Sequence, residues 1–159
     1  MIFVTVGTQA PFDRLIKAID SIAPSLGEPV IAQALKGSYV PKNIEVIDFI
    51  APDKFSKYFN SATLVVAHAG MGTVISALTD SKPLIIFPRK ASLGEHRNEH
   101  QMATAKRLKA MEYVNVAFTP EELESMLKNR DTLIVSAPIG DKASSSLTES
   151  LSNFILYGK

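Results

Sequence analysis

The sequence contains no cysteine, which excludes disulfide bonds and thiolate chemistry and is typical of an intracellular protein. Neither sign of charge is in excess, because 17 lysines and arginines face 16 aspartates and glutamates, for a formal net charge of +1. This balance gives no general reason to expect binding to nucleic acid or to an acidic membrane. Long apolar runs are also missing. The opening run, Met1–Val6, ends at Gly7 and has no basic flank, so it predicts a first strand and neither a signal peptide nor a membrane span.

The remaining composition is that of a soluble globular protein, with 159 residues of which 46% are hydrophobic. No internal repeat, low-complexity stretch or obvious linker divides the chain. We expect one Rossmann-like domain over residues 1–140. Residues 141–159 predict a final amphipathic helix, with Leu147, Leu151, Phe154 and Ile155 on one side, that packs on the domain or docks a partner.

Short apolar runs alternate with segments of helical periodicity along the chain. Such alternation predicts an α/β fold in which helices wrap a doubly wound parallel sheet. The connection over residues 36–41 is too short for a confident helix, whereas Thr119, Pro120 and Glu122 form a strong helix start. The expected strands cover residues 1–6, 29–32, 44–49, 64–67, 84–87 and 113–116, and helices are expected near 12–22, 53–58, 72–81, 102–108 and from 120.

A glycine-rich turn, Ala67–Thr73, separates the fourth strand from the next helix. Free backbone N–H groups at such a helix start favour a bound anion, phosphate above all. The turn matches neither the dinucleotide fingerprint nor the P-loop, so its glycines could equally serve only a tight turn. If the strand order is 3-2-1-4-5-6, the turn lies at the switch point beside Gly7, Thr8 and Gln9, and the exit of the fifth strand at Arg89 opens onto the same edge.

The polar segment Gly94–Gln101 holds two of the three histidines, His96 and His100. On a helix these two would share one face, and the string His96–His100 matches the His-x-x-Glu-His pattern of one class of zinc peptidases. A catalytic zinc needs a third protein ligand that no recognisable motif supplies, so we expect no metal. Two alternatives remain: a solvated helix start, or a set of donors and acceptors that binds the hydroxyls of a sugar, with Arg89 supplying charge to a phosphate.

His68 opens the glycine turn and also has two interpretations. A lone histidine after a buried strand is often a hydrogen-bonded core residue. Its place at the predicted crevice favours contact with a diphosphate or a sugar.

Several stretches together resemble one known family, the stand-alone form of the family 28 glycosyltransferase C-terminal domain. Its members include the small catalytic subunit of the bipartite dolichol-linked N-acetylglucosamine transferase and the PssE-type subunits of exopolysaccharide synthesis, and the latter are the more similar. The stretches are Phe3–Thr8, Pro11–Leu15, His68–Thr73, Lys82-Pro83, Pro88-Arg89 and Gly94–Gln101.

The resemblance implies the C-terminal half of a GT-B glycosyltransferase that takes a UDP-sugar without a metal ion or other cofactor. The implied acceptor is linked to a polyprenyl diphosphate, in exopolysaccharide or capsule synthesis. A membrane-anchored partner subunit would complete the cleft and hold this chain at the cytoplasmic, inner face of the membrane. A non-catalytic nucleotide-binding module and a self-contained UDP-sugar enzyme remain the alternatives.

The residues expected at the site fall into two groups. The candidate catalytic residues, including a general base, are His68, Glu95 and His96. One departure from the family is Ser76, which stands where relatives such as MurG carry a glutamate often assigned to the ribose. The expected donor-binding residues are Gly7, Thr8, Gln9, Ala69, Gly70, Met71, Gly72, Thr73, Arg89, Asn98, His100 and Gln101.

Overall fold

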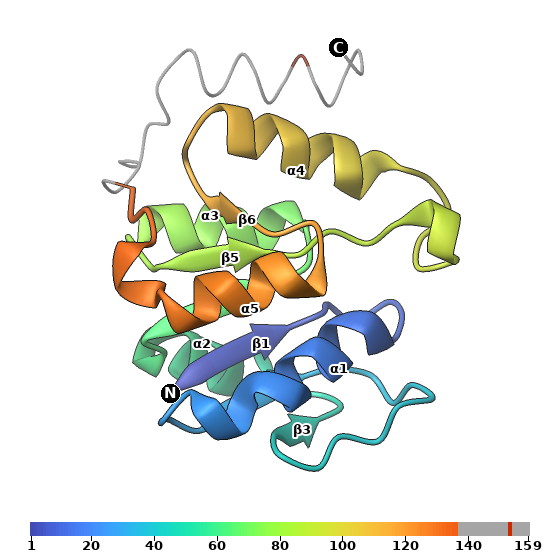
Figure 1. Cartoon of the computed structure of the whole chain (residues 1–159), viewed down its shortest axis with the longest axis vertical. Coiled ribbons are helices and arrows are strands. Elements are labelled where there is room, and N and C mark those ends of the chain that lie inside the picture. The colour runs from blue at the N-terminus through green and yellow to red at the C-terminus, as the bar shows by residue number, and fades with distance from the viewer. Residues whose placement is uncertain (137–152, 154–159) are drawn as a thin grey trace.

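The computed structural model, which describes residues 1–136 and Asn153, is built on one six-stranded sheet (Figure 1). All pairs in the sheet are parallel, and the strand order is β3-β2-β1-β4-β5-β6. The predicted doubly wound fold and its switch point between β1 and β4 are therefore confirmed. The strands are β1 (Ile2–Thr5), β2 (Val30–Gln33), β3 (Glu45–Ile47), β4 (Leu64–Ala67), β5 (Leu84–Ile86) and β6 (Asn115–Val116).

The central strands are buried on both faces, which explains why they read as unbroken apolar runs. Successive side chains alternate between two separate cores. In β1, for example, Ile2 and Val4 belong to one core, and Phe3 belongs to the other.

Helices α1 (Asp13–Ile22) and α5 (Pro120–Lys128) cover the first of these faces. They lie next to each other although about a hundred residues of sequence separate them (Figure 1). Leu15 and Ile19 of α1 and Leu123 and Leu127 of α5 are almost completely buried there. Helix α5 begins as expected, because the hydroxyl of Thr119 accepts a hydrogen bond from the Glu122 N–H.

Helices α2 (Pro52–Ser61), α3 (Met71–Thr79) and α4 (His100–Ala110) cover the opposite face. Their buried side chains include Phe59, Val74 and Leu108. Short 3₁₀ segments at Ala23–Ser25, Ala91–Leu93 and Arg130–Thr132 complete the described elements. No helix forms between β2 and β3, in agreement with the sequence.

The helix expected near residues 102–108 is confirmed as α4, but it does not extend back to His96. His96 does not share a helical face with His100, because α4 begins only at His100. The preceding residues form a 3₁₀ turn that ends at Gly94, whose φ is 70°. The geometry assumed for the zinc-peptidase pattern is therefore absent.

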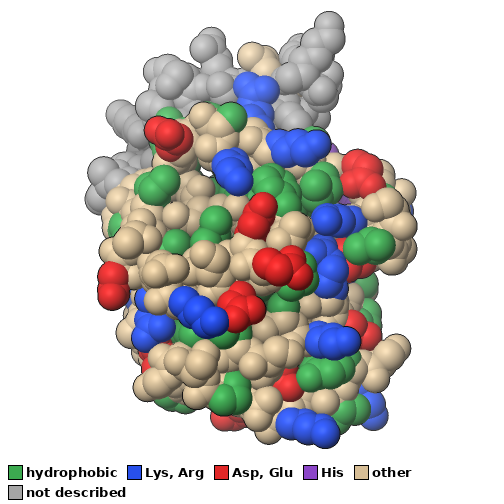
Figure 2. Space-filling model, in the orientation of Figure 1, with side chains coloured by type: hydrophobic (Ala, Val, Ile, Leu, Met, Phe, Trp, Pro, Cys, Tyr) green, Lys and Arg blue, Asp and Glu red, His purple; other side chains and the backbone are tan. Residues whose placement is uncertain are grey.

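The described surface carries both signs of charge. Figure 2 shows lysine and arginine side chains interspersed with aspartate and glutamate over this face. Among the described helices, none combines the length and the apolar character needed to cross a bilayer. The predicted helix of residues 141–159 lies outside the described residues apart from Asn153.

Candidate functional site

A polar cavity of about 270 Å³ lies at the carboxyl ends of the central strands. It brings together the turn after β1, the first residue after β4, the exit of β5 and the start of α4, as the switch-point rule predicts. Eight expected site residues line it together with Val6 and Ala10: Gly7, Thr8, Gln9, His68, Arg89, Glu95, His96 and Gln101.

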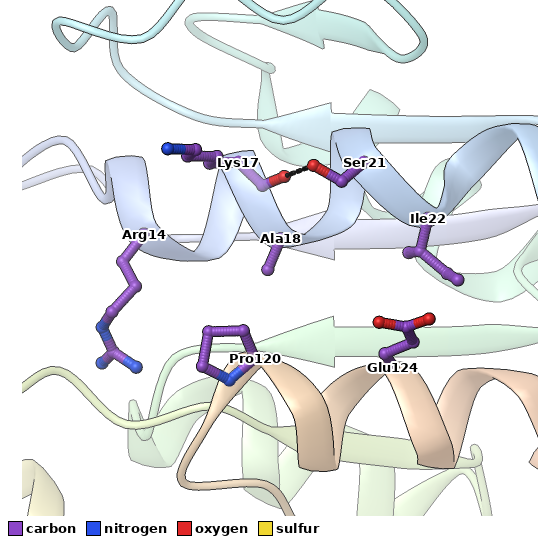
Figure 3. A pocket seen from close by; sticks show the side chains of 7 residues that line it. All are labelled: Arg14, Lys17, Ala18, Ser21, Ile22, Pro120 and Glu124. Carbon is purple, nitrogen blue, oxygen red and sulfur yellow. Dashed lines mark hydrogen bonds between the residues drawn. The ribbon is translucent and has the colours of Figure 1, made fainter.

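A larger groove of about 400 Å³ runs between α1 and α5 (Figure 3). It is lined by Arg14, Lys17, Ala18, Ser21, Ile22, Pro120 and Glu124. None of the residues expected at the site lines this groove, and it contains no histidine. The switch-point cavity is therefore the better candidate despite its smaller volume.

The imidazole of His68 lies against two glycines from different turns. A Cβ atom placed on Gly7 would lie 2.9 Å from its Cε1 atom, and one on Gly70 would lie 2.3 Å from its Nε2 atom. Gly7 also has a φ of 77°, which residues with a side chain rarely adopt. Both glycines therefore make room for this histidine.

Burial lowers the pKa of His68, and the nearby positive charge of Arg89 lowers it further. The nearby backbone of Thr5 opposes these effects, but the pKa still falls below its usual value of 6.5. Its Nδ1 atom is buried without a hydrogen-bond partner in the described part of the chain. The ring is therefore neutral at pH 7, a form that can accept a proton.

Arg89 is 3% exposed, and its guanidinium binds backbone carbonyl groups. Nη2 donates to Val6 O at 3.0 Å and to Ala10 O at 2.7 Å, and Nη1 donates to Pro11 O at 2.6 Å. Burial lowers its pKa, and the Glu95 carboxylate opposes that change. The sequence suggested that Arg89 supplies charge to a phosphate. In the structure Arg89 holds the turn after β1 in place and adds a positive charge to the cavity wall.

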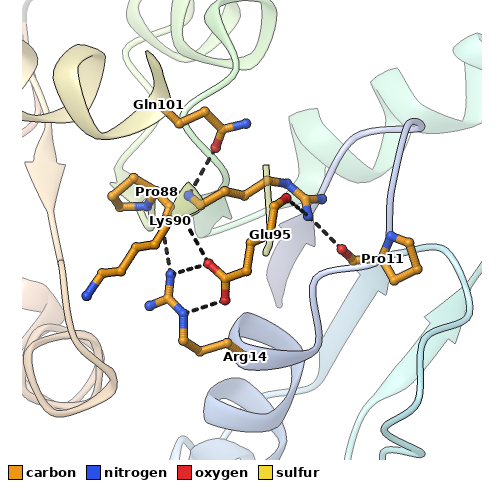
Figure 4. A network of polar contacts seen from close by, with 7 residues as sticks. Pro11, Arg14, Pro88, Lys90, Glu95 and Gln101 are labelled. Atoms are coloured by element: carbon orange, nitrogen blue, oxygen red, sulfur yellow. Dashed lines mark hydrogen bonds and ion pairs between the residues drawn. The ribbon is translucent and has the colours of Figure 1, made fainter. Parts of the chain in front are cut away.

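Glu95 makes a two-point ion pair with Arg14 (Figure 4). Arg14 Nε donates to Oε1 at 2.7 Å, and Arg14 Nη2 donates to Oε2 at 2.9 Å. The Lys90 N–H donates to the same Oε2 at 2.8 Å. Both carboxylate oxygens are thus engaged within the protein, an arrangement that suits a structural residue rather than the general base expected from the sequence.

Residues at and just before the start of α4 contribute polar groups to the cavity wall. Gln101 is 7% exposed, and its Oε1 accepts a hydrogen bond from the Arg89 N–H at 3.1 Å (Figure 4). Asn98 Oδ1 accepts from the His100 N–H at 3.1 Å and so stabilises the helix start. The Nδ1 atom of His96 lies 3.1 Å from the side chain and from the carbonyl of Asn98. Asn98 and His100 themselves do not line the cavity.

The glycine turn leads into α3 with Gly70 as the residue before the helix. The Gly70 N–H is used locally, by the His68 carbonyl at 2.8 Å. Within the described residues, the N–H groups of Met71, Gly72 and Thr73 have no hydrogen-bond partner. This helix start can accept an anion next to the cavity, although none of the residues from 69 to 73 lines the cavity itself. Ala69, expected to bind the donor, is 5% exposed and packs in the core.

Two polar residues that support the site were missed from the sequence. Gln33 is 3% exposed, and its side-chain N–H donates to the Gly7 carbonyl at 3.2 Å while its Oε1 accepts from the Thr5 hydroxyl at 2.8 Å. Arg14 is the second. A polar side chain at the end of an apolar strand was a signal for Gln33, whereas nothing local marks Arg14. Across the described residues, no cluster of histidine, aspartate and glutamate could hold a metal ion.

A family model for the glycosyltransferase family 28 C-terminal domain matches residues 1–134. The human UDP-N-acetylglucosamine transferase subunit ALG13 is 33% identical over 118 residues, which cover 67% of this chain and 10% of the human protein. The protein of the same name from Eremothecium gossypii is 30% identical over 110 residues, which cover 66% of this chain and 50% of that protein. This chain thus spans half or less of the length of these relatives.

Solved structures share the fold at low sequence identity. The NMR solution structure of ALG13 has a TM-score of 0.60 at 20% identity and covers 94% of this chain and 93% of that one. The crystal structure of Acinetobacter baumannii MurG has a TM-score of 0.64 at 19% identity, covering 98% of this chain and 49% of that one. The chain therefore corresponds in fold to about half of MurG.

Proposed function

Because the chain belongs to the glycosyltransferase family 28 C-terminal domain family, we propose that it is the donor-binding, catalytic subunit of a UDP-sugar-dependent glycosyltransferase. One observation carries this proposal. The polar cavity at the switch point lies beside the start of α3, where three N–H groups are unpaired in the described residues. A diphosphate at α3 and a sugar in the cavity would use both features.

The proposed reaction moves the sugar from UDP to an acceptor hydroxyl. The bond between the sugar and the diphosphate breaks, and UDP leaves with the electron pair. N–H groups at the start of α3 would stabilise the negative charge that develops on UDP, and the charge of Arg89 lies nearby. This stabilisation requires no metal ion, in keeping with the expected lack of a cofactor.

The acceptor hydroxyl must also lose its proton to a base. His68, whose lowered pKa keeps it neutral, and His96 both line the cavity and are the candidate bases in this chain. Glu95 is the weaker candidate because its oxygens already accept hydrogen bonds from Arg14 and Lys90.

The finer assignment is a hexosyltransferase of exopolysaccharide or capsule synthesis, acting on a polyprenyl-diphosphate-linked acceptor. The described fold is a single lobe, whereas a GT-B enzyme needs two facing lobes. A membrane-anchored partner subunit would supply the second lobe and the acceptor site, and would place this chain at the inner face of the membrane. Two relatives carry the word subunit in their names, which supports a partner.

Calorimetric titration with UDP, UDP-N-acetylglucosamine, UDP-glucose, UDP-galactose and UDP-glucuronate, without metal, tests the proposal. We expect the native chain to bind UDP and at least one of the sugars. Gly72→Asp should weaken binding at least about a hundredfold, since it places a carboxylate where the diphosphate would lie. A Cβ atom at position 72 meets no atom within 4 Å, so the variant should fold.

Gly72→Asn is the matched control, because it has the same shape without the charge. We expect it to keep most of the affinity. Equal binding by Gly72→Asp and the native chain would contradict the placement of the diphosphate. Failure to bind any of the five compounds, both alone and when co-expressed with a membrane subunit, would contradict the function itself.

A further inference from the structure

Arg14 lies on α1, outside the cavity, yet it binds the segment that forms one of the cavity walls. Its guanidinium holds both oxygens of Glu95, and Nη2 also donates to the Pro88 carbonyl at 2.7 Å (Figure 4). The two charged side chains are only 17% and 13% exposed. An ion pair this enclosed is screened less by water than a surface pair.

The segment of residues 90–97 has few other connections. Its internal hydrogen bonds join neighbours, as in the bond from the Glu95 N–H to the Lys90 carbonyl at 3.2 Å. Ser92 and His96 bond to Glu99 and Asn98, which follow directly in the chain. Among the described residues, the hydrogen bonds of the segment to more distant parts of the domain all involve Glu95: the carboxylate with Arg14, and the carbonyl with Arg89 at 3.4 Å. Ser92, Leu93, Gly94 and Arg97 are exposed. Apart from its own contacts with the neighbouring Asn98, His96 therefore depends on the contacts of Glu95 for its position.

Two aromatic rings also contact the guanidinium of Arg14. Its Cζ atom lies 4.2 Å from the ring centroid of Phe87 and 5.4 Å from that of Phe12. Arg89 lies over the same Phe12 ring at 4.4 Å. Both rings are completely or almost completely buried in the core. Arg14 thus ties a largely exposed segment to two buried rings of the core.

We propose that Arg14 is a positioning residue: through Glu95 it fixes the segment of residues 90–97, and so places His96 against the sugar of the bound donor. This role rests on the function proposed above. The role concerns only the sugar of the donor. The diphosphate would bind at α3, which Arg14 does not contact. Loss of Arg14 should therefore weaken the contribution of the sugar and spare that of UDP.

Two measurements on the full chain test the role. The first is amide hydrogen exchange without ligand, comparing the native protein with Arg14→Met, which keeps apolar packing on the rings but removes every donor. We expect exchange in residues 91–97 to become about tenfold faster, while the amides of β1 and β4 are unchanged. The second is titration with UDP and with the best-bound UDP-sugar. We expect affinity for the UDP-sugar to fall about tenfold and affinity for UDP to change less than about twofold.

Arg14→Lys should restore part of both properties, since it keeps the charge and loses the two-point geometry. The double variant Arg14→Met with Glu95→Gln should be no worse than Arg14→Met, because the two residues act as one unit. Arg130→Met is the matched control. Arg130 also pairs with a carboxylate, that of Glu28, at 3.4 Å, and donates to the carbonyl of Leu26 at 3.0 Å. Neither Arg130 nor Glu28 lines the cavity.

Unchanged exchange in residues 91–97 of Arg14→Met would overturn the positioning role whatever the ligand results. An equal loss of affinity for UDP and UDP-sugar would overturn it as well, since a general structural defect would have that effect. A native chain that binds neither compound, both alone and when co-expressed with a membrane subunit, would overturn the proposed function and the sugar contact with it. In that case the exchange measurement would still decide whether Arg14 fixes the segment.

Discussion

The Nε2 atom of His68 occupies the space that a side chain on Gly70 would need, because a Cβ atom there would lie only 2.3 Å away. Gly70→Ala must therefore displace the imidazole or the turn. We expect a loss of about 1–3 kcal/mol in the free energy of unfolding, as for overpacked cores. Chemical denaturation measures this loss, and calorimetry with UDP measures the accompanying loss of binding.

Gly72→Ala is the control for that substitution, since nothing lies within 4 Å of a Cβ atom at position 72. It should keep stability or gain up to about 1 kcal/mol from helix propensity. Adding His68→Ala to Gly70→Ala should recover part of the stability, because it removes the clash. A Gly70→Ala variant as stable as Gly72→Ala would contradict the packing described here.

Arg89 should matter more for stability than a surface arginine does. Arg89→Met leaves the carbonyls of Val6, Ala10 and Pro11 without their donor, and that of Val6 is buried. We expect a loss of about 2–4 kcal/mol in the free energy of unfolding, with Arg89→Lys intermediate. The exposed Arg97 offers the comparison, and Arg97→Met should change stability by less than about 0.5 kcal/mol. Equal effects of the two methionine variants would refute the assignment of Arg89 as a backbone-holding residue.

The lowered pKa of His68 makes stability depend on pH. Since the unfolded chain has the usual pKa of 6.5 and the folded chain a lower one, the unfolded state binds the proton first as pH falls. Stability from this group should therefore be fully present above pH 6.5 and decrease below it, until the folded pKa is passed. Denaturation midpoints between pH 8 and pH 5 measure the effect. His68→Gln should lose this part of the slope, and an unchanged slope would argue against a buried neutral imidazole.

Asp20 is a buried acid that does not line the cavity and that holds the connection between β2 and β3. It is 2% exposed and accepts hydrogen bonds from the Tyr39 hydroxyl at 2.7 Å and from the N–H groups of Lys42 and Asn43 at 2.9 and 2.6 Å. Burial alone would raise its pKa, but these bonds together lower it below 3.8. Its stabilisation should be present above pH 3.8 and be lost as pH falls through the lowered pKa.

Asp20→Ala should cost about 2–3 kcal/mol at pH 7, because the partly buried hydrogen bonds from the Lys42 and Asn43 N–H groups and from the Tyr39 hydroxyl lose their acceptor. Asp20→Asn should cost less, since an amide oxygen still accepts. Asp53→Asn, at an exposed position on α2, should change stability by less than about 0.5 kcal/mol. Thermal unfolding at pH 7 ranks the three variants, and an Asp20→Ala variant as stable as Asp53→Asn would contradict the role of this carboxylate.

The sequence by itself determined the sheet and the place of the site. Buried parallel strands are apolar throughout, so the runs at β1, β4 and β5 could be identified without structural information. The start of α5 was equally readable, because a helix cap depends on residues that are close in sequence, here Thr119 and Glu122. Once the strand order is known, the meeting of Gly7 with His68 follows from the parallel sheet.

Only the tertiary structure decided what the polar residues of the site do. Arg14 and Glu95 are 81 residues apart, and no periodicity in either segment indicates that they form a pair. Arg89 and Glu95 seemed free to bind a ligand because the sequence does not show which carbonyls and side chains surround them. A buried polar group must satisfy its hydrogen bonds wherever the fold brings partners to it, and those partners come from distant parts of the chain.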